Sequence, residues 1–200
     1  ALCKGTPGSV QELLAESRQA LPQEEMDTAV FYSISNCQEG LRGISFGSSL
    51  IKQVVGELHQ ELPQIDSFVT LSPIPGLMRH LKTQGGNGEL VAAAERGDLA
   101  AIKARSDELL LAAARWLAEV KRPDGAPADP VARFHLGNGA ELLGVHALAD
   151  ISPNGLQQSA TAMVNYLYDL DRVEANHEAF ATRDQIVMSK DIKALLAANP

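Results

Sequence analysis

The sequence has 200 residues, of which 45% are hydrophobic and only 4% are aromatic. This length suits one globular domain, or one domain with part of another, and supplies enough apolar side chains for a core. The net charge of −8 argues against a nucleic-acid partner, because binding a phosphate backbone requires concentrated Lys and Arg. It does not exclude a small anionic ligand, which needs only a few N–H donors and one or two cations.

Cysteine and histidine usage gives no indication of a metal site. Cys3 and Cys37 are the only cysteines, and neither has the spacing of a metal-binding motif.

No apolar run approaches the length that crosses a bilayer, and the amino-terminal residues lack the apolar region of a signal peptide. We therefore predict a cytoplasmic protein with reduced thiols and no membrane contact. The first residue is Ala1, which is expected if the chain is part of a longer protein.

The first half of the chain has the pattern of a βαβ unit. A short helix is predicted over Val10–Ala20, and the β-branched and aromatic segment Thr28–Ser35 predicts a buried strand. A glycine-rich stretch over residues 40–47 leads into an amphipathic helix that starts at Ser48 and stops before Pro63. Ser67–Leu71 predicts a second strand, parallel to the first.

The glycine-rich stretch is a candidate phosphate site, because ligands of such units bind at the carboxyl ends of the strands. Gly43 and Gly47 would let the backbone approach a pyrophosphate, and the start of the following helix offers unpaired N–H groups. Arg42 could add a charge-assisted hydrogen bond. The stretch matches neither G-x-G-x-x-G nor a P-loop, so an ordinary turn before a helix is the alternative.

The second half is predicted to be mainly helical. Its helix from Ser152 is predicted from an N-cap serine followed by Pro153, with Met163, Val164 and Leu167 on one face. The predicted elements are a loop over residues 84–87, one or two helices over Glu89–Val120 broken near Gly97, a linker over residues 121–130, a strand over Glu141–Ala149, a helix from Ser152 to about Leu170, and a helix over Asp191–Ala198.

Ser72 and His135 are candidate catalytic side chains, each with an ordinary structural alternative. Ser72 ends the second predicted strand and precedes two prolines, where most serines only form turns, and G-x-S-x-G is absent. His135 lies between Phe and Leu in FHLGNGA, where a histidine is more often partly buried and structural.

Four segments together resemble malonyl-CoA decarboxylases over roughly residues 25–180. They are FYSISNCQEGLRGISFGSSLIKQVV, LSPIPG, DPVARFHLGNGA and SPNGLQQSATAMVNYLYDLDRVEANHEAF, in this order. The resemblance implies an α/β (α+β) fold like the GCN5-related N-acetyltransferases, a mixed sheet flanked by helices. It also implies that residues 1–200 are the carboxy-terminal part of the catalytic acyl-CoA-binding domain, truncated at the amino terminus and without the family's amino-terminal helical domain.

The resemblance also assigns site residues. It places the catalytic serine on Ser72, the catalytic histidine on His135 and a functional tyrosine on Tyr168. It implies conversion of malonyl-CoA to acetyl-CoA and CO2 without a metal or cofactor, in a protein that forms homo-oligomers. Ser72 would donate a hydrogen bond to the carboxylate or thioester oxygen. His135, as imidazolium, would supply the C2 proton or orient the group that supplies it. The CoA-binding loop would comprise Arg42, Gly43, Ile44, Ser45, Phe46, Gly47 and Ser48.

One segment departs from the family pattern. GAELLGVHALAD has His146 and Ala147 where an Asn-Trp pair is expected. Two other functions therefore stay open: an acyl-CoA-dependent acetyltransferase of the same fold, and a non-catalytic acyl-CoA-binding fragment. Release of CO2 from malonyl-CoA without an acceptor would distinguish the decarboxylase from the acetyltransferase, and CoA binding without turnover would indicate the fragment.

Overall fold

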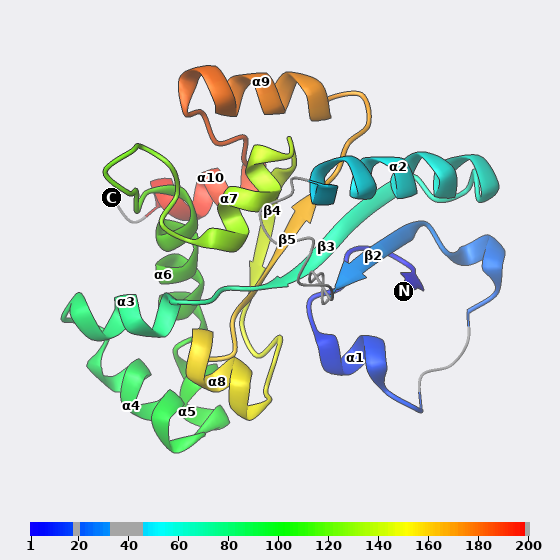
Figure 1. Ribbon diagram of the computed structural model, residues 1–200. Coiled ribbons are helices and arrows are strands. Elements are labelled where there is room, and N and C mark those ends of the chain that lie inside the picture. Colours follow the sequence, from blue (N-terminus) through cyan, green and yellow to red (C-terminus); the bar gives the residue numbers. More distant parts are fainter. Residues whose placement is uncertain (18–20, 33–45, 199–200) are drawn as a thin grey trace.

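The computed structural model describes residues 1–17, 21–32 and 46–198, and its strands form one five-stranded sheet (Figure 1). The order across the sheet is β1-β2-β3-β5-β4. The strands are β1 (Leu2–Cys3), β2 (Thr28–Tyr32), β3 (Ser67–Pro73), β4 (Glu141–His146) and β5 (Met163–Leu167). In the part of the chain that is described, no helix is both long and apolar enough to cross a membrane.

The predicted βαβ unit is confirmed. β2 runs parallel to β3, with Thr28 opposite Ser67 and Tyr32 opposite Leu71. The chain passes between them through α2, which spans Phe46–Glu61 and so ends before Pro63. The pairs β1–β2, β3–β5 and β4–β5 are antiparallel, so the sheet is mixed, as the resemblance implied.

Helices account for most of the remaining described residues. Where the sequence predicted one or two helices over Glu89–Val120 there are three, and the predicted break at Gly97 is confirmed, with φ of 68°. α1 ends at Leu14, earlier than predicted. The helices are α1 (Val10–Leu14), η1 (Gln23–Glu25), α2, α3 (Leu77–Thr83), α4 (Gly88–Arg96), α5 (Leu99–Ala104), α6 (Ser106–Ala118), α7 (Pro130–Gly137), α8 (Pro153–Ser159), α9 (Val173–Arg183) and α10 (Lys190–Ala197).

The two faces of the sheet have different cores. Phe68 of β3 belongs to the main core, which also contains buried residues of α2, α6 and α7. Val69 and Leu71 belong to a smaller core that α1 covers. Because successive side chains of a strand point to opposite faces, Thr70 and Ser72 share the face of Phe68. Ser72 therefore lies on the same side of the sheet as α7.

Residues 163–167 are a strand, so the helix predicted to run to about Leu170 is wrong after its first two turns. α8 ends at Ser159, and the next two residues, Ala160 and Thr161, have positive φ of 51° and 79°. The Thr161 hydroxyl accepts a hydrogen bond from Leu148 N at 3.0 Å, which holds this turn against the loop after β4. The segment that follows pairs with β3 on one side and with β4 on the other, and this pairing makes it a strand.

Residues 130–137 form helix α7. The sequence had predicted no helix here, only a linker over residues 121–130 and a strand from Glu141. Asp129 is the N-cap: its Oδ1 accepts from Val131 N at 2.9 Å and from Ala132 N at 2.8 Å. Pro130 occupies the first helical position, where its missing N–H costs nothing. Pro123 and Pro127 of the predicted linker thus lie in a loop that leads into α7, whereas Pro130 lies in the helix itself.

Candidate active site

A continuous hydrogen-bonded chain joins Ser72, His135 and Tyr168. Ser72 Oγ lies 3.2 Å from His135 Nε2, and the Tyr168 hydroxyl lies 2.9 Å from His135 Nδ1. All three side chains are buried, with exposed fractions of 4%, 2% and 2%. The three residues predicted as catalytic from the resemblance therefore meet in one place, from β3, α7 and the segment just after β5.

β3 holds Ser72 next to a second hydroxyl that the sequence analysis did not single out. Thr70 lies two residues earlier on the same face, and its Oγ1 is 2.9 Å from Ser72 Oγ. Thr70 is fully buried and its Oγ1 also accepts from Tyr166 N at 3.3 Å. Its carbonyl oxygen accepts from Asn165 Nδ2 at 2.8 Å. The Thr70 and Asn165 side chains thus link β3 to β5 next to Ser72. These links hold the backbone around Ser72 in place.

The amino-terminal end of α7 is fixed by a buried carboxylate. Asp129 has no exposed surface, and besides capping the helix its Oδ2 accepts from Trp116 Nε1 at 3.3 Å. Burial raises the pKa of Asp129, an effect that the N–H groups of Ala132, Trp116 and Val131 oppose. Asp129 therefore connects the start of α7 to α6 and sets where His135, in the last turn, is placed.

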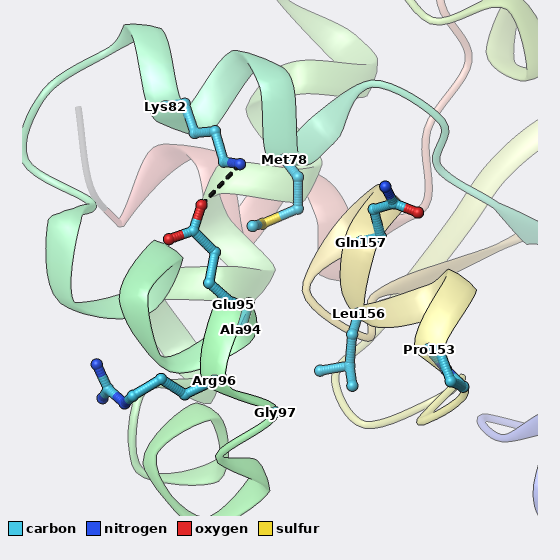
Figure 2. A pocket seen from close by; sticks show the side chains of 9 residues that line it. All are labelled: Met78, Lys82, Ala94, Glu95, Arg96, Gly97, Pro153, Leu156 and Gln157. Carbon is cyan, nitrogen blue, oxygen red and sulfur yellow. Dashed lines mark ion pairs between the residues drawn. The ribbon is translucent and has the colours of Figure 1, made fainter.

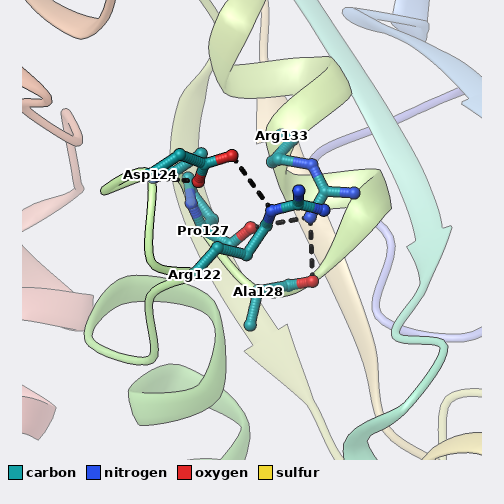
Figure 3. Close-up of polar contacts among 6 residues, drawn as sticks. Arg122, Asp124, Pro127, Ala128 and Arg133 are labelled. Atoms are coloured by element: carbon teal, nitrogen blue, oxygen red, sulfur yellow. Dashed lines mark hydrogen bonds and ion pairs between the residues drawn. The ribbon is translucent and has the colours of Figure 1, made fainter.

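The loop before α7 is attached to that helix by Arg133. Its Nη1 donates to the carbonyl oxygens of Pro127 and Ala128, at 2.8 and 2.9 Å (Figure 3). Arg122 in the same loop pairs with Asp124 at 3.2 Å. Because two carbonyl groups bind one guanidinium, the residues that lead into the Asp129 cap have a defined conformation.

The carboxyl-terminal end of α7 is held by α9. Asn176 Nδ2 donates to Gly139 O at 3.1 Å, and His177 Nδ1 donates to Gly137 O at 2.6 Å. Gly139 has φ of 84°, and a Cβ on it would lie 2.0 Å from Val173 O. Only glycine fits this close approach between α9 and the turn that follows α7. α7 is thus fixed at both ends, with His135 between them.

β5 and the residue that follows it place two tyrosines around the imidazole. The Tyr166 ring stacks on His135 with centroids 4.6 Å apart and an interplanar angle of 23°, while Tyr168 meets the ring edge-on. Among the described residues, the Tyr166 hydroxyl and Asn138 Nδ2 are buried without a hydrogen-bond partner. These contacts restrict rotation of the His135 ring, so its two nitrogens stay directed at Ser72 and Tyr168.

Burial determines the charge states of the site. It lowers the pKa of His135 from 6.5 to about 3, so the imidazole is neutral near pH 7. Burial also raises the pKa of Tyr168 well above its usual value, which Asn138 partly opposes. The free site therefore holds a neutral histidine and a neutral tyrosine. The expectation that His135 acts as an imidazolium does not fit this environment, because the ring is desolvated and no carboxylate contacts it among the described residues.

The predicted CoA-binding loop is only partly within the described residues. Arg42, Gly43, Ile44 and Ser45 lie outside them, and Phe46, Gly47 and Ser48 form the start of α2. α2 itself is held by Lys52, whose Nζ lies 2.7 Å from Glu174 Oε1 of α9. One helix, α9, therefore contacts both α2 and α7.

Two clefts elsewhere on the described surface do not contain the Ser72–His135 pair. One of about 500 Å³ lies between α3, α4 and α8 (Figure 2), where Lys82 and Glu95 pair at 2.8 Å. Another of about 600 Å³ lies at the start of β3 and is lined by Tyr168 but not by Ser72. No group of three or more His, Cys, Asp or Glu side chains suited to a metal occurs among residues 1–17, 21–32 and 46–198.

Comparison with known proteins gives one consistent family. A family model described as the malonyl-CoA decarboxylase C-terminal domain matches residues 1–200. A mitochondrial malonyl-CoA decarboxylase from Anser anser anser is 33% identical over 230 residues, which cover 98% of this chain and 46% of that protein. The Rattus norvegicus protein of the same name is also 33% identical and is covered to 47%.

Solved structures agree with the sequence comparison. The crystal structure of a malonyl-CoA decarboxylase from Agrobacterium vitis has a TM-score of 0.90 and 43% identity, covering 98% of this chain and 52% of that one. The corresponding protein from Rhodopseudomonas palustris has a TM-score of 0.88 and 44% identity, with 98% and 48% covered. The chain thus spans about half the length of the relatives it matches.

Proposed function

Because the chain belongs to the malonyl-CoA decarboxylase family, we propose that it supplies the catalytic side chains for decarboxylation of malonyl-CoA to acetyl-CoA and CO2. The observation that carries this proposal is the buried chain from Ser72 through His135 to Tyr168. The relatives bear the name of that activity, which favours it over acetyl transfer and over CoA binding alone.

The reaction requires a donor for a developing oxyanion. When the C–C bond to CO2 breaks, its electron pair stays on C2 and delocalises onto the thioester oxygen as an enolate. A pre-positioned hydroxyl that donates to that oxygen lowers the barrier, because the charge it meets develops only in the transition state. Ser72, held by its neighbours on β3, is our candidate for this donor.

The enolate must then gain one proton at C2, so each CO2 released consumes one proton from solvent. Ser72, His135 and Tyr168 form a hydrogen-bonded path along which a proton can move one place at a time. In this account neutral His135 orients Ser72 and receives the hydrogen bond of Tyr168. Orientation is one of the two roles that the sequence analysis left open for His135, but the ring proposed for it here is neutral and not an imidazolium.

The CoA moiety is proposed to bind at the start of α2, over Arg42–Ser48. The first N–H groups of a helix and an adjacent Arg are suited to the diphosphate of CoA. α2 has sixteen residues, so its amino-terminal end carries the full effect of the helix dipole. In a calorimetric titration, Arg42→Ala should weaken CoA binding, and unchanged affinity would contradict this assignment. Homo-oligomer formation and a cytoplasmic location stay predictions.

The proposed activity is tested by incubating the intact protein with malonyl-CoA and no acyl acceptor. We expect release of CO2 with formation of acetyl-CoA, and Ser72→Ala should lower kcat by about 10²–10³, the effect of losing one oxyanion donor. Ser106→Ala, which removes an exposed hydroxyl bonded to Lys103 O, is the matched control and should keep full turnover. Turnover that appears only when an amine acceptor is added would instead establish the acetyltransferase.

A further inference from the structure

One set of hydrogen-bond directions gives the protons of Tyr168, His135 and Ser72 each an acceptor, and it begins at Tyr168. The Tyr168 hydroxyl is buried and lies 2.9 Å from His135 Nδ1. Within the described residues, this hydroxyl has no hydrogen bond other than the one to His135 Nδ1. Among the described residues, Nδ1 of His135 is therefore the acceptor that the Tyr168 O–H reaches.

This direction fixes the protonation of the imidazole. A neutral imidazole carries one N–H, and its other nitrogen accepts. Because burial keeps His135 neutral and Nδ1 accepts from Tyr168, the proton of His135 is on Nε2. Nε2 lies 3.2 Å from Ser72 Oγ, so His135 donates to Ser72.

The Ser72 proton must then point away from His135. The acceptor in reach is Thr70 Oγ1, 2.9 Å from Ser72 Oγ and fully buried. A hydroxyl oxygen has two acceptor positions. At Thr70 Oγ1, one acceptor position accepts from Tyr166 N at 3.3 Å, and the other can accept from the Ser72 hydroxyl.

We propose that Thr70 is a positioning residue, which receives the Ser72 proton and thereby holds His135 in the Nε2–H tautomer. In this state Ser72 is prepared to turn its proton onto a substrate oxygen. With the opposite directions, Ser72 would donate to Nε2, as a nucleophilic serine does toward its histidine base. The role of Thr70 in turnover rests on the proposed function, whereas the tautomer is a property of the protein without substrate.

The tautomer can be read by NMR of the intact protein labelled with ¹⁵N-histidine, because protonated and unprotonated ring nitrogens differ widely in chemical shift. Comparison with His135→Gln assigns the signal. We expect Nε2 to be protonated and Nδ1 unprotonated near pH 7. Protonation at Nδ1 in the wild type would overturn the proposal, whether or not the protein decarboxylates malonyl-CoA.

Two substitutions test Thr70 itself. Thr70→Val keeps the branched shape but removes the acceptor, so we expect a mixture of tautomers and a kcat lower by about tenfold, as for one lost hydrogen bond, with KM unchanged. Thr70→Ser restores the hydroxyl and should restore the single tautomer and most of the turnover. If Thr70→Val folds and keeps both the wild-type tautomer and the wild-type kcat, Thr70 has no positioning role.

Discussion

Ser72 Oγ and His135 Nε2 lie 3.2 Å apart although 63 positions separate the two residues in the sequence. β3 presents the serine on one face of the sheet, and α7 crosses that face with the histidine in its last turn. Neither residue is accessible to solvent to any large extent. The contact therefore depends on how rigidly α7 is attached, and the following predictions concern that attachment and its electrostatic result.

The depressed pKa of His135 predicts a pH-dependent stability. The folded-state pKa of about 3 lies below the unfolded value of 6.5, so the stabilising contribution is present above pH 6.5 and is lost as pH falls from 6.5 toward 3. Between pH 7 and pH 5, the wild type should lose about 2 kcal/mol more unfolding free energy than His135→Gln. Urea unfolding at both pH values measures this. Equal losses in the two proteins would mean that His135 titrates normally.

Loss of the Asp129 cap should affect both stability and turnover. Asp129→Ala removes the oxygen that accepts from two N–H groups at the start of α7, and it leaves the Trp116 N–H unpaired. We therefore expect the unfolding free energy to fall by about 2 kcal/mol or more. The matched control is Asp98→Ala, which removes the cap of α5 through Ala101 N, remote from the site. It should cost about 1 kcal/mol without lowering kcat.

Thermal unfolding and steady-state kinetics of the two capping variants provide the comparison. Of the two variants, we expect only Asp129→Ala to lower kcat, because it changes the start of the helix that carries His135. Equal kcat values in the two variants would show that Asp129 only stabilises the fold.

Much of the fold follows from local sequence pattern, and the failures have physical causes. The strand near Thr28, the helix after Ser48 and the strand after Ser67 were predicted because each has a clear apolar pattern. Residues 163–167 have apolar spacing that fits a helix as well, and only the neighbouring strands β3 and β4 decide for a strand. α7 was missed because the prolines before it were interpreted as a linker, although Asp129 and Pro130 are a recognisable helix start.

The candidate site was predictable only in part. The resemblance gave Ser72, His135 and Tyr168, which the structure brings together. Thr70 carried a usable signal, since residues two apart on a strand share a face. The stacking of Tyr166 on His135 had none, because it depends on the crossing of α7 over β5, and burial likewise makes His135 neutral.

The approach of α9 to α7 predicts a severe effect of one added methyl group. In Gly139→Ala the new Cβ would meet Val173 O at 2.0 Å, and the positive φ adds strain, so we expect a loss of about 2–4 kcal/mol and a lower kcat. Gly125→Ala is a matched control with the same φ of 84°, but its Cβ would meet only the Asp184 side chain at 3.3 Å. It should lose about 1 kcal/mol.

Chemical denaturation measures the unfolding free energy of the two glycine variants. The difference between their losses is the effect of the clash with Val173 O. If both lose the same free energy, backbone conformation and not the contact between α7 and α9 explains the need for glycine.

The central claim is that Ser72 acts as a hydrogen-bond donor in decarboxylation and forms no covalent bond to the substrate. Intact-mass spectrometry of the protein during turnover of malonyl-CoA, with CO2 release recorded on the same sample, tests it directly. We predict steady CO2 release with the protein mass unchanged at every time point. A malonyl or acetyl adduct that forms and decays at the rate of turnover, and that maps to Ser72, would contradict the account and establish acyl transfer.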